Sequence, residues 1–156
     1  MENIIKLFKN SVEVKNELIS SNSLEVIATM GDVIVESILS EGKMMLCGNG
    51  GSAADAQHLA AEMLIRLRPN NNREGIPALA LAQDTSTITA CGNDFGYDFL
   101  FERLVQSIGK KGDILIAITT SGNSQNIYEA LKVAKKMKIF SIGFFGNKGG
   151  KCKKIT

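Results

Sequence analysis

The most constraining feature of this sequence is a set of four short apolar runs, separated from one another by segments with helical spacing. The runs cover residues 44–47, 78–82, 113–119 and 139–145. Unbroken apolar runs of this length are typical of strands buried on both faces, as in a parallel sheet covered by helices. The pattern therefore predicts an α/β fold, a doubly wound three-layer α/β/α sandwich with a parallel sheet.

The first 41 residues are expected to add two helices to this sandwich. Apolar residues recur at helical spacing over 4–19 and over 24–39, and Ser21-Asn22-Ser23 interrupts the pattern between them. Both predicted helices are amphipathic, with enough apolar surface to pack against something outside their own pair. We expect one domain over residues 1–156, with N-terminal helices at 1–41 and an α/β core at 42–156.

Composition and charge exclude several classes of protein. Apolar residues make up 44% and charged residues 22% of the 156 residues, which argues against a disordered or collagen-like chain. There is no run of 18 apolar residues and no signal peptide, so no membrane association is expected. The net charge of +2 has no basic stripe, so we expect no nucleic-acid partner. Three cysteines without CxxC spacing favour reduced thiols in the cytoplasm.

Two polar loops, at 48–52 and 119–124, each follow a predicted strand and precede a predicted helix. In open parallel sheets, ligands bind at such strand ends, and hydroxyl and N–H groups at a helix start favour an anion such as phosphate. Either loop alone is equally well explained as a helix cap with a tight turn. Two such loops at corresponding positions favour a phosphorylated ligand.

Nucleotide binding is a less favoured reading of the first loop. The loop lacks the lysine of a Walker A motif, so a nucleotide triphosphatase is not expected. Gly48, Gly50 and Ala53 do match the looser dinucleotide pattern G-x-G-x-x-A. However, the acidic residue expected about 20 positions later is missing, since Asp84 lies too far along the chain. A nicotinamide site remains an alternative.

His58 and Glu62 lie four residues apart on the helix that follows the first loop, so they project from one face. Such a pair can share a metal or transfer a proton, and it can equally be a solvated ion pair. His58 is the only histidine, so this chain alone cannot complete a histidine-rich metal site. A third polar cluster, residues 92–96, is by itself typical of a loop with an Asx-type turn.

Together these segments resemble the sugar isomerase (SIS) domain, and within it the phosphoheptose isomerases. The resemblance rests on CGNGGSAADAQHLAAE at 47–62, CGNDFG at 91–96, TTSGNS at 119–124 and GNKGGK at 146–151. Their order and spacing hold across essentially the whole chain. The family fold is a flavodoxin-like doubly wound sandwich, in agreement with the strand pattern.

The resemblance implies an aldose–ketose isomerase that converts sedoheptulose 7-phosphate to D-glycero-D-manno-heptose 7-phosphate through an enediol(ate). This is the first step towards the ADP-heptose of bacterial lipopolysaccharide core or capsule. It implies substrate contacts from Asn49, Gly50, Gly51, Ser52, Asn93 and Asp94, and phosphate contacts from Thr119, Thr120, Ser121 and Ser124. It further implies one zinc ion per subunit on His58 and Glu62, with Glu62 also binding substrate and acting as the catalytic base.

By the same resemblance, we expect a cytoplasmic homotetramer with sites between subunits. The family continues past the position of Thr156 through a strand and a long helix, which supply a glutamine and a histidine as further metal ligands, and the general acid. Ending inside a strand leaves a sheet edge unfinished. We therefore expect these residues to be the ordered portion of a longer protein rather than a truncated form.

A second function remains open. A related group of SIS proteins is non-catalytic and associates with the bacterial replication initiator. Those relatives need not carry an acid at position 62 or a serine at position 121. Both Glu62 and Ser121 are present in this chain, which favours the isomerase.

Overall fold

The computed structural model describes residues 1–156, apart from the side chain of Asn147. The chain forms two units, Met1–Val35 and Glu36–Thr156. The first unit holds α1 (Glu2–Ser20) and most of α2 (Ser23–Leu39), which confirms the two predicted N-terminal helices. No residue of α1 is buried, and its apolar side chains, including Ile4, Phe8 and Val12, are exposed. Among the described residues, no single helix could cross a membrane by length and apolarity; only the bent pair of α1 and α2, taken together, meets that test.

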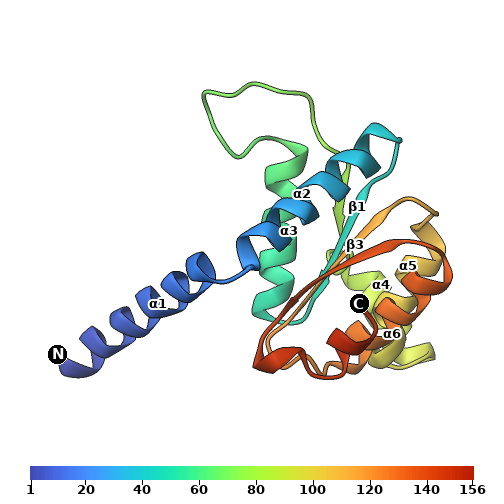
Figure 1. Ribbon diagram of the computed structural model, residues 1–156. Helices are drawn as coiled ribbons and strands as arrows, with labels where there is room; N and C mark the ends of the chain where they lie inside the picture. Colours follow the sequence, from blue (N-terminus) through green and yellow to red (C-terminus); the bar gives the residue numbers. More distant parts are fainter. The chain divides into compact units, whose positions relative to one another are not determined.

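The second unit is built on a four-stranded parallel sheet (Figure 1). Its strands are β1 (Met44–Gly48), β2 (Ala78–Ala80), β3 (Ile114–Thr119) and β4 (Phe140–Phe145), in the order β2-β1-β3-β4. All four predicted strands are therefore present. Gly48 pairs with Ile118, so β1 and β3 end side by side at one edge of the sheet.

Helices connect successive strands. α3 (Gly51–Leu64) joins β1 to β2, and α6 (Gln125–Lys136) joins β3 to β4. Between β2 and β3 the chain forms α4 (Thr85–Asp94), a short 3-10 turn η1 (Tyr97–Phe99) and α5 (Leu100–Ile108). Two further 3-10 turns, η2 (Asn147–Gly149) and η3 (Cys152–Lys154), follow β4.

The prediction of a loop at 92–96 was wrong for its first three residues, because α4 continues to Asp94. The helix is well started, since the Asp84 carboxylate accepts hydrogen bonds from the Ser86 and Thr87 amides, both at 3.0 Å. Cys91, just before these residues, is buried in the core, which holds this part of α4 in place. The helix ends only before Gly96, whose φ of 91° reverses the chain.

The helices cover both faces of the sheet. Side chains alternate between the faces along each strand. One face contributes Met45, Cys47, Leu115 and Ala117 to a core shared with buried residues of α5 and α6, namely Phe101, Val105, Ile127 and Leu131. The other face is covered by α3, whose Ala56 and Ala60 are buried (Figure 1). The predicted doubly wound three-layer sandwich is confirmed.

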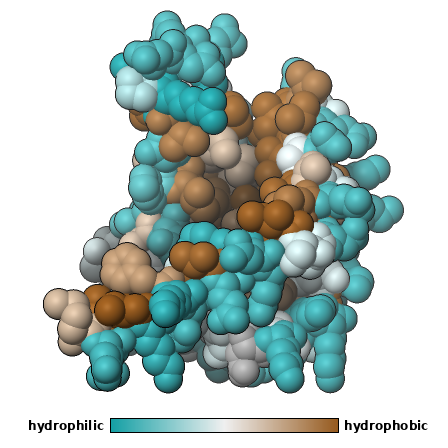
Figure 2. Space-filling view, turned by 60° about the vertical axis from the view of Figure 1, so that its left-hand side comes forward, coloured by the Kyte–Doolittle hydropathy of each residue, from teal (hydrophilic) through white to brown (hydrophobic). Residues whose placement is uncertain are grey.

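Apolar side chains also remain at the surface. Figure 2 shows apolar groups gathered on one face, with hydrophilic groups around them. The exposed side chains of β4 are apolar too, since Phe140 and Phe144 are about half exposed. Contiguous exposed apolar surface is typical of an interaction site.

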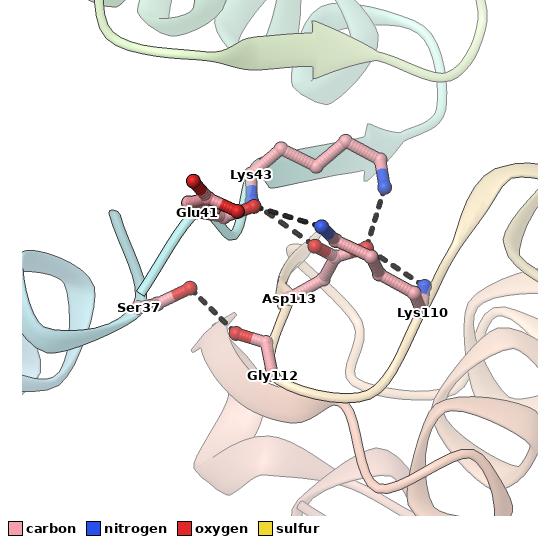
Figure 3. A network of polar contacts seen from close by, with 6 residues as sticks. All are labelled: Ser37, Glu41, Lys43, Lys110, Gly112 and Asp113. Atoms are coloured by element: carbon pink, nitrogen blue, oxygen red, sulfur yellow. Dashed lines mark hydrogen bonds and ion pairs between the residues drawn. The ribbon is translucent and has the colours of Figure 1, made fainter. Parts of the chain in front are cut away.

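A buried carboxylate fixes the edge of the sheet opposite to the polar loops. Asp113 is fully buried at the start of β3 and accepts hydrogen bonds from the amides of Lys43 (3.0 Å) and Lys110 (2.8 Å). The Lys43 ammonium lies 2.5 Å from the same carboxylate (Figure 3). Next to it, the Ser37 hydroxyl donates to the Gly112 carbonyl at 2.6 Å. These bonds tie the end of α2, the start of β1 and the start of β3 together.

Replacing this carboxylate should destabilise the fold strongly. Asp113→Ala leaves one ammonium and two amides without their acceptor, so we expect the free energy of unfolding to fall by about 3–5 kcal/mol. Urea denaturation measures the change. The control is Asp98→Ala at an exposed position, for which a change within about 0.5 kcal/mol is expected. Equal effects of the two substitutions would contradict this role for Asp113.

Candidate functional site

The loop between β3 and α6 brings three hydroxyls together at a helix start. Thr119 Oγ1 lies 3.0 Å from Ser124 Oγ and 3.4 Å from Ser121 Oγ. Ser124 is the N-cap residue of α6, but its hydroxyl faces Thr119 and makes no capping bond to the helix. Thr120 is exposed on the same loop. Hydroxyls and amide groups at the positive end of a helix dipole suit a phosphate-like anion.

The segment after β4 holds this loop in shape. Gly122 has φ of 66°, and a Cβ there would lie 2.3 Å from the carbonyl of Gly149, so only glycine fits. The Cys152 amide donates to the Gly122 carbonyl at 3.0 Å, and the Gly146 amide donates to the Thr119 carbonyl at 3.1 Å. The GNKGGK segment singled out in the sequence therefore acts as backbone support for the hydroxyl loop.

The loop between β1 and α3 lies beside it. The crossover from β1 leads to β2 and that from β3 leads to β4, on opposite sides of the pair. The two loops therefore diverge, which is where ligands bind in doubly wound sheets. Asn49, Gly50, Gly51 and Ser52 all lie here, and Gly50 is the N-cap residue of α3.

Two residues at this edge were missed by sequence reasoning. The Tyr97 hydroxyl donates to Asn49 Oδ1 at 2.9 Å, and the side-chain amide of Asn126 exchanges two hydrogen bonds with that of Asn49. Both contacts join segments far apart in the chain. The only available signal was a polar residue, Asn126, on a helix face that should be buried.

Asn93 and Asp94 lie at the end of α4 and bond to each other, with Asn93 Nδ2 donating to Asp94 Oδ1 at 2.8 Å. Tyr97 follows three residues later and reaches Asn49, which brings this part of the chain to the same edge of the sheet.

Asp84, the nearest acid for a dinucleotide site, caps the start of α4. The Thr87 hydroxyl and the amides of Thr87 and Ser86 lower its pKa.

His58 and Glu62 form a pair farther along α3. His58 Nε2 lies 3.1 Å from Glu62 Oε1, and the two side chains are 76% and 28% exposed. They line a cleft of about 470 Å³ with Leu59, Met63, Arg68 and Ile76 among its walls. A carboxylate facing an imidazole at this distance can exchange a proton or share a cation.

The pair fits part of a zinc site. It supplies one nitrogen and one oxygen donor, both of which zinc accepts, whereas a structural or catalytic site uses three or four protein ligands. Within the described part of the chain, no three His, Cys, Asp or Glu side chains are grouped to hold a metal. A zinc ion on His58 and Glu62 therefore needs further ligands besides this pair.

Within one chain, the pair of His58 and Glu62 lies apart from the hydroxyl loop between β3 and α6. α3 begins beside the loop at Gly51 and runs away from it, and Glu62 lies eleven residues later. At a rise of 1.5 Å per residue, that is about 16 Å along the helix axis. The cleft around Glu62 is lined by α3 and the segment that follows it, and by none of the hydroxyl residues.

The three cysteines are free and buried, in agreement with the expected thiols. Burial, and to a smaller extent Cys152, raises the pKa of Cys47; burial likewise raises the pKa of Cys152. Both thiols therefore stay neutral near pH 7, and a neutral thiol is a poor nucleophile. They belong to the core and carry no chemistry at this site.

Comparison with known proteins identifies one family. The model of the SIS domain family matches residues 7–146. The phosphoheptose isomerase of Chlorobaculum parvum is 48% identical over 134 residues, covering 86% of this chain and 64% of the relative. That of Clostridium acetobutylicum is 44% identical over 155 residues, covering 98% and 78%. This chain thus spans somewhat less than two thirds of the first relative's length.

Solved structures agree with the sequence comparison. The phosphoheptose isomerase GmhA from Neisseria gonorrhoeae superposes with a TM-score of 0.89 at 38% identity, covering 99% of this chain and 79% of that one. A phosphoheptose isomerase from Francisella tularensis gives 0.91 at 34% identity, covering 98% and 78%.

Removing a hydroxyl from the β3–α6 loop should weaken anion binding. We expect Ser124→Ala to lower the affinity for inorganic phosphate by about tenfold or more, because a hydrogen bond to a charged group is lost. Isothermal titration calorimetry measures the affinity. Ser107→Ala is the control, since Ser107 is exposed on α5 and bonds only to its own helix, at the Arg103 carbonyl. The assignment of the loop is wrong if the two variants bind phosphate equally well.

Proposed function

Because this chain belongs to the SIS domain family and, within it, to the phosphoheptose isomerases, we propose that it isomerises sedoheptulose 7-phosphate to D-glycero-D-manno-heptose 7-phosphate. The observation that carries the proposal is the cluster of Thr119, Ser121 and Ser124 hydroxyls at the start of α6. It suits the phosphate of such a substrate, and a carboxylate able to move a proton, Glu62, is retained in the same chain.

In the proposed reaction, the β3–α6 loop holds the phosphate with Thr119, Thr120, Ser121 and Ser124. Anchoring one end of the substrate fixes the distance to the reacting carbons at its other end. Asn49, Gly50, Gly51 and Ser52 line the sugar from the neighbouring loop, with Asn93 and Asp94 as further contacts from the end of α4. In this proposal the two strand-end loops bind the substrate.

Glu62 performs the proton transfer. The carboxylate removes a proton from C1 of the ketose, the C1–H electron pair forms the C1–C2 double bond, and the C2 carbonyl oxygen takes the negative charge of an enediolate. Transfer of the O1 proton to the C2 oxygen and return of the first proton from Glu62 to C2 leave an aldehyde at C1 and a hydroxyl at C2. His58, 3.1 Å from Glu62, orients the carboxylate for this task.

We further propose one zinc ion per subunit, with His58 and Glu62 as two of its ligands. When bound, zinc supplies positive charge that stabilises the oxygens of the enediolate. His58 and Glu62 offer the nitrogen and oxygen donors that this ion accepts. The further ligands lie outside the described residues of this chain.

The active site is built from more than one copy of the chain. Extended sedoheptulose 7-phosphate spans about 9 Å from C2 to phosphorus, given C–C bonds of about 1.5 Å. Glu62 lies about 16 Å along α3 from the loop of its own chain. This separation is long compared with the substrate and favours a site that takes the loop from one copy and Glu62 from another, as in the homotetramer with sites between subunits that we propose. The exposed apolar side chains of α1 and of β4, among them Phe8 and Phe144, offer surface for such contacts.

The cellular setting follows from the proposed reaction. Its product supplies heptose for the ADP-heptose of lipopolysaccharide core or capsule, and the free thiols suit the reducing cytoplasm. The alternative, a non-catalytic SIS protein that associates with the replication initiator, differs in one measurable property: it has no turnover.

Glu62→Gln should slow isomerisation strongly while keeping the substrate bound. We expect kcat for sedoheptulose 7-phosphate to fall by about 10²–10⁴-fold, because the proton carrier is lost, with little change in KM. The matched control is Glu129→Gln, another partly buried and paired helical glutamate, which should retain wild-type kcat. Unaltered kcat in Glu62→Gln would reject the assigned role, and wild-type protein without turnover would favour the non-catalytic alternative.

Two inactive variants should complement each other if the site is shared. Co-expression of Glu62→Gln with the Ser121→Ala/Ser124→Ala variant forms sites that take an intact loop from one copy and an intact Glu62 from another. Random assembly gives about a quarter of wild-type turnover. Each variant expressed alone is the control. Co-expressed protein as inactive as the single variants would place each site within one chain.

A further inference from the structure

The strongest unused feature is a pair of side-chain amides that joins the two loops at the end of the sheet. Asn126 lies in the first turn of α6 and is only 2% exposed. Asn49 Nδ2 donates to Asn126 Oδ1, and Asn126 Nδ2 donates to Asn49 Oδ1, both at 2.9 Å. The Tyr97 hydroxyl, from η1, donates to Asn49 Oδ1 at 2.9 Å as well.

A backbone amide determines which way both side chains point. The N–H of Ile127 lies 2.9 Å from Asn126 Oδ1, and a backbone N–H can only donate. The atom facing it must therefore be the oxygen of Asn126, not the nitrogen. That oxygen also faces the amide nitrogen of Asn49, and so the oxygen of Asn49 faces the nitrogen of Asn126. The orientation of Asn49 follows from the helix backbone.

This arrangement leaves Asn49 only one way to meet a ligand. Its oxygen already accepts from two donors, Asn126 and Tyr97, which use both of its lone pairs. Its nitrogen uses one N–H on Asn126 and retains the second. Between the two loops, Asn49 therefore presents a hydrogen-bond donor and no acceptor.

We infer that Asn126 and Tyr97 are positioning residues that lock the Asn49 amide so that its remaining N–H donates to an oxygen of the bound sugar phosphate. The inference rests on the proposed function. The acceptor is an oxygen of the phosphate or of a neighbouring sugar hydroxyl. Neither Asn126 nor Tyr97 touches the substrate; they act through Asn49.

A double-mutant cycle tests this coupling. Asn49→Ala and Asn126→Leu should each lower kcat/KM for sedoheptulose 7-phosphate by about 3–10-fold, the value of one neutral hydrogen bond. The double variant should be no worse than Asn49→Ala alone, because Asn126 acts only through Asn49. A further loss in the double variant, equal to that of Asn126→Leu in wild type, would overturn the inference.

Tyr97→Phe tests the same coupling without a substitution at the buried Asn126. Tyr97 is 51% exposed, so this variant should fold normally and still lower kcat/KM about threefold in wild type, but not in Asn49→Ala. Tyr128→Phe is the matched control, since Tyr128 is the other tyrosine of the chain and should tolerate the loss of its hydroxyl unchanged. Equal losses in the two phenylalanine variants, or none in Tyr97→Phe, contradict the inference.

Asn49→Asp removes the donor. Its carboxylate still accepts from Asn126 Nδ2 and Tyr97, but it has no N–H for Asn126 Oδ1 or for the ligand, and its negative charge repels a phosphate. We therefore expect a loss of kcat/KM at least as large as in Asn49→Ala. Wild-type activity in Asn49→Asp would contradict the donor role. Lower affinity for inorganic phosphate in Asn49→Ala places the acceptor on the phosphate, whereas unchanged affinity with a raised KM places it on the sugar.

These readouts separate this inference from the proposed function. If wild-type protein shows no turnover, the proposed isomerase activity fails. The same cycle is then measured as affinity for sedoheptulose 7-phosphate by calorimetry. Non-additive losses of affinity would still support the positioning role, and additive losses would overturn it.

Discussion

The parallel pairing of β1 with β3 determines where the chemistry of this protein can lie. The two strands end together, with Gly48 opposite Ile118, and their crossovers then leave in opposite directions. The loops that follow have no helix between them, so their glycines, hydroxyls and helix starts face a shared space. At the opposite edge, the buried Asp113 carboxylate binds the start of β3 to the residue that precedes β1, which keeps these strands in register.

The same topology divides the proposed site into two halves. A helix that crosses back over a sheet must carry its last residues away from the strand ends, and α3 does so with Glu62. The start of α3 at the strand ends and Glu62 near its other end are thus about 16 Å apart along the helix axis. In the proposed function, this separation is the reason for a site shared between copies of the chain.

Much of the fold was predictable because all four apolar runs became strands. Burial on both faces explains the runs of β1 and β3, whereas β4 keeps apolar side chains that are half exposed. The hydroxyl loop was also predictable, since it depends on local chemistry at a strand end. The extent of α4 was not, because Gly92 and Asn93 favour a turn locally, and the Asp84 cap and the burial of Cys91 outweigh that preference. The contacts of Asn49 with Asn126 and Tyr97 join distant segments, and no local pattern reveals them. The roles given to the site residues remain predictions.

The most direct test of this account is a crystal structure of the protein with sedoheptulose 7-phosphate bound. The account predicts the phosphate against Thr119, Ser121 and Ser124 at the start of α6, and C1 and C2 of the same molecule beside Glu62 of a neighbouring copy. A phosphate bound away from this loop, or reacting carbons beyond the reach of every Glu62 carboxylate, would contradict it.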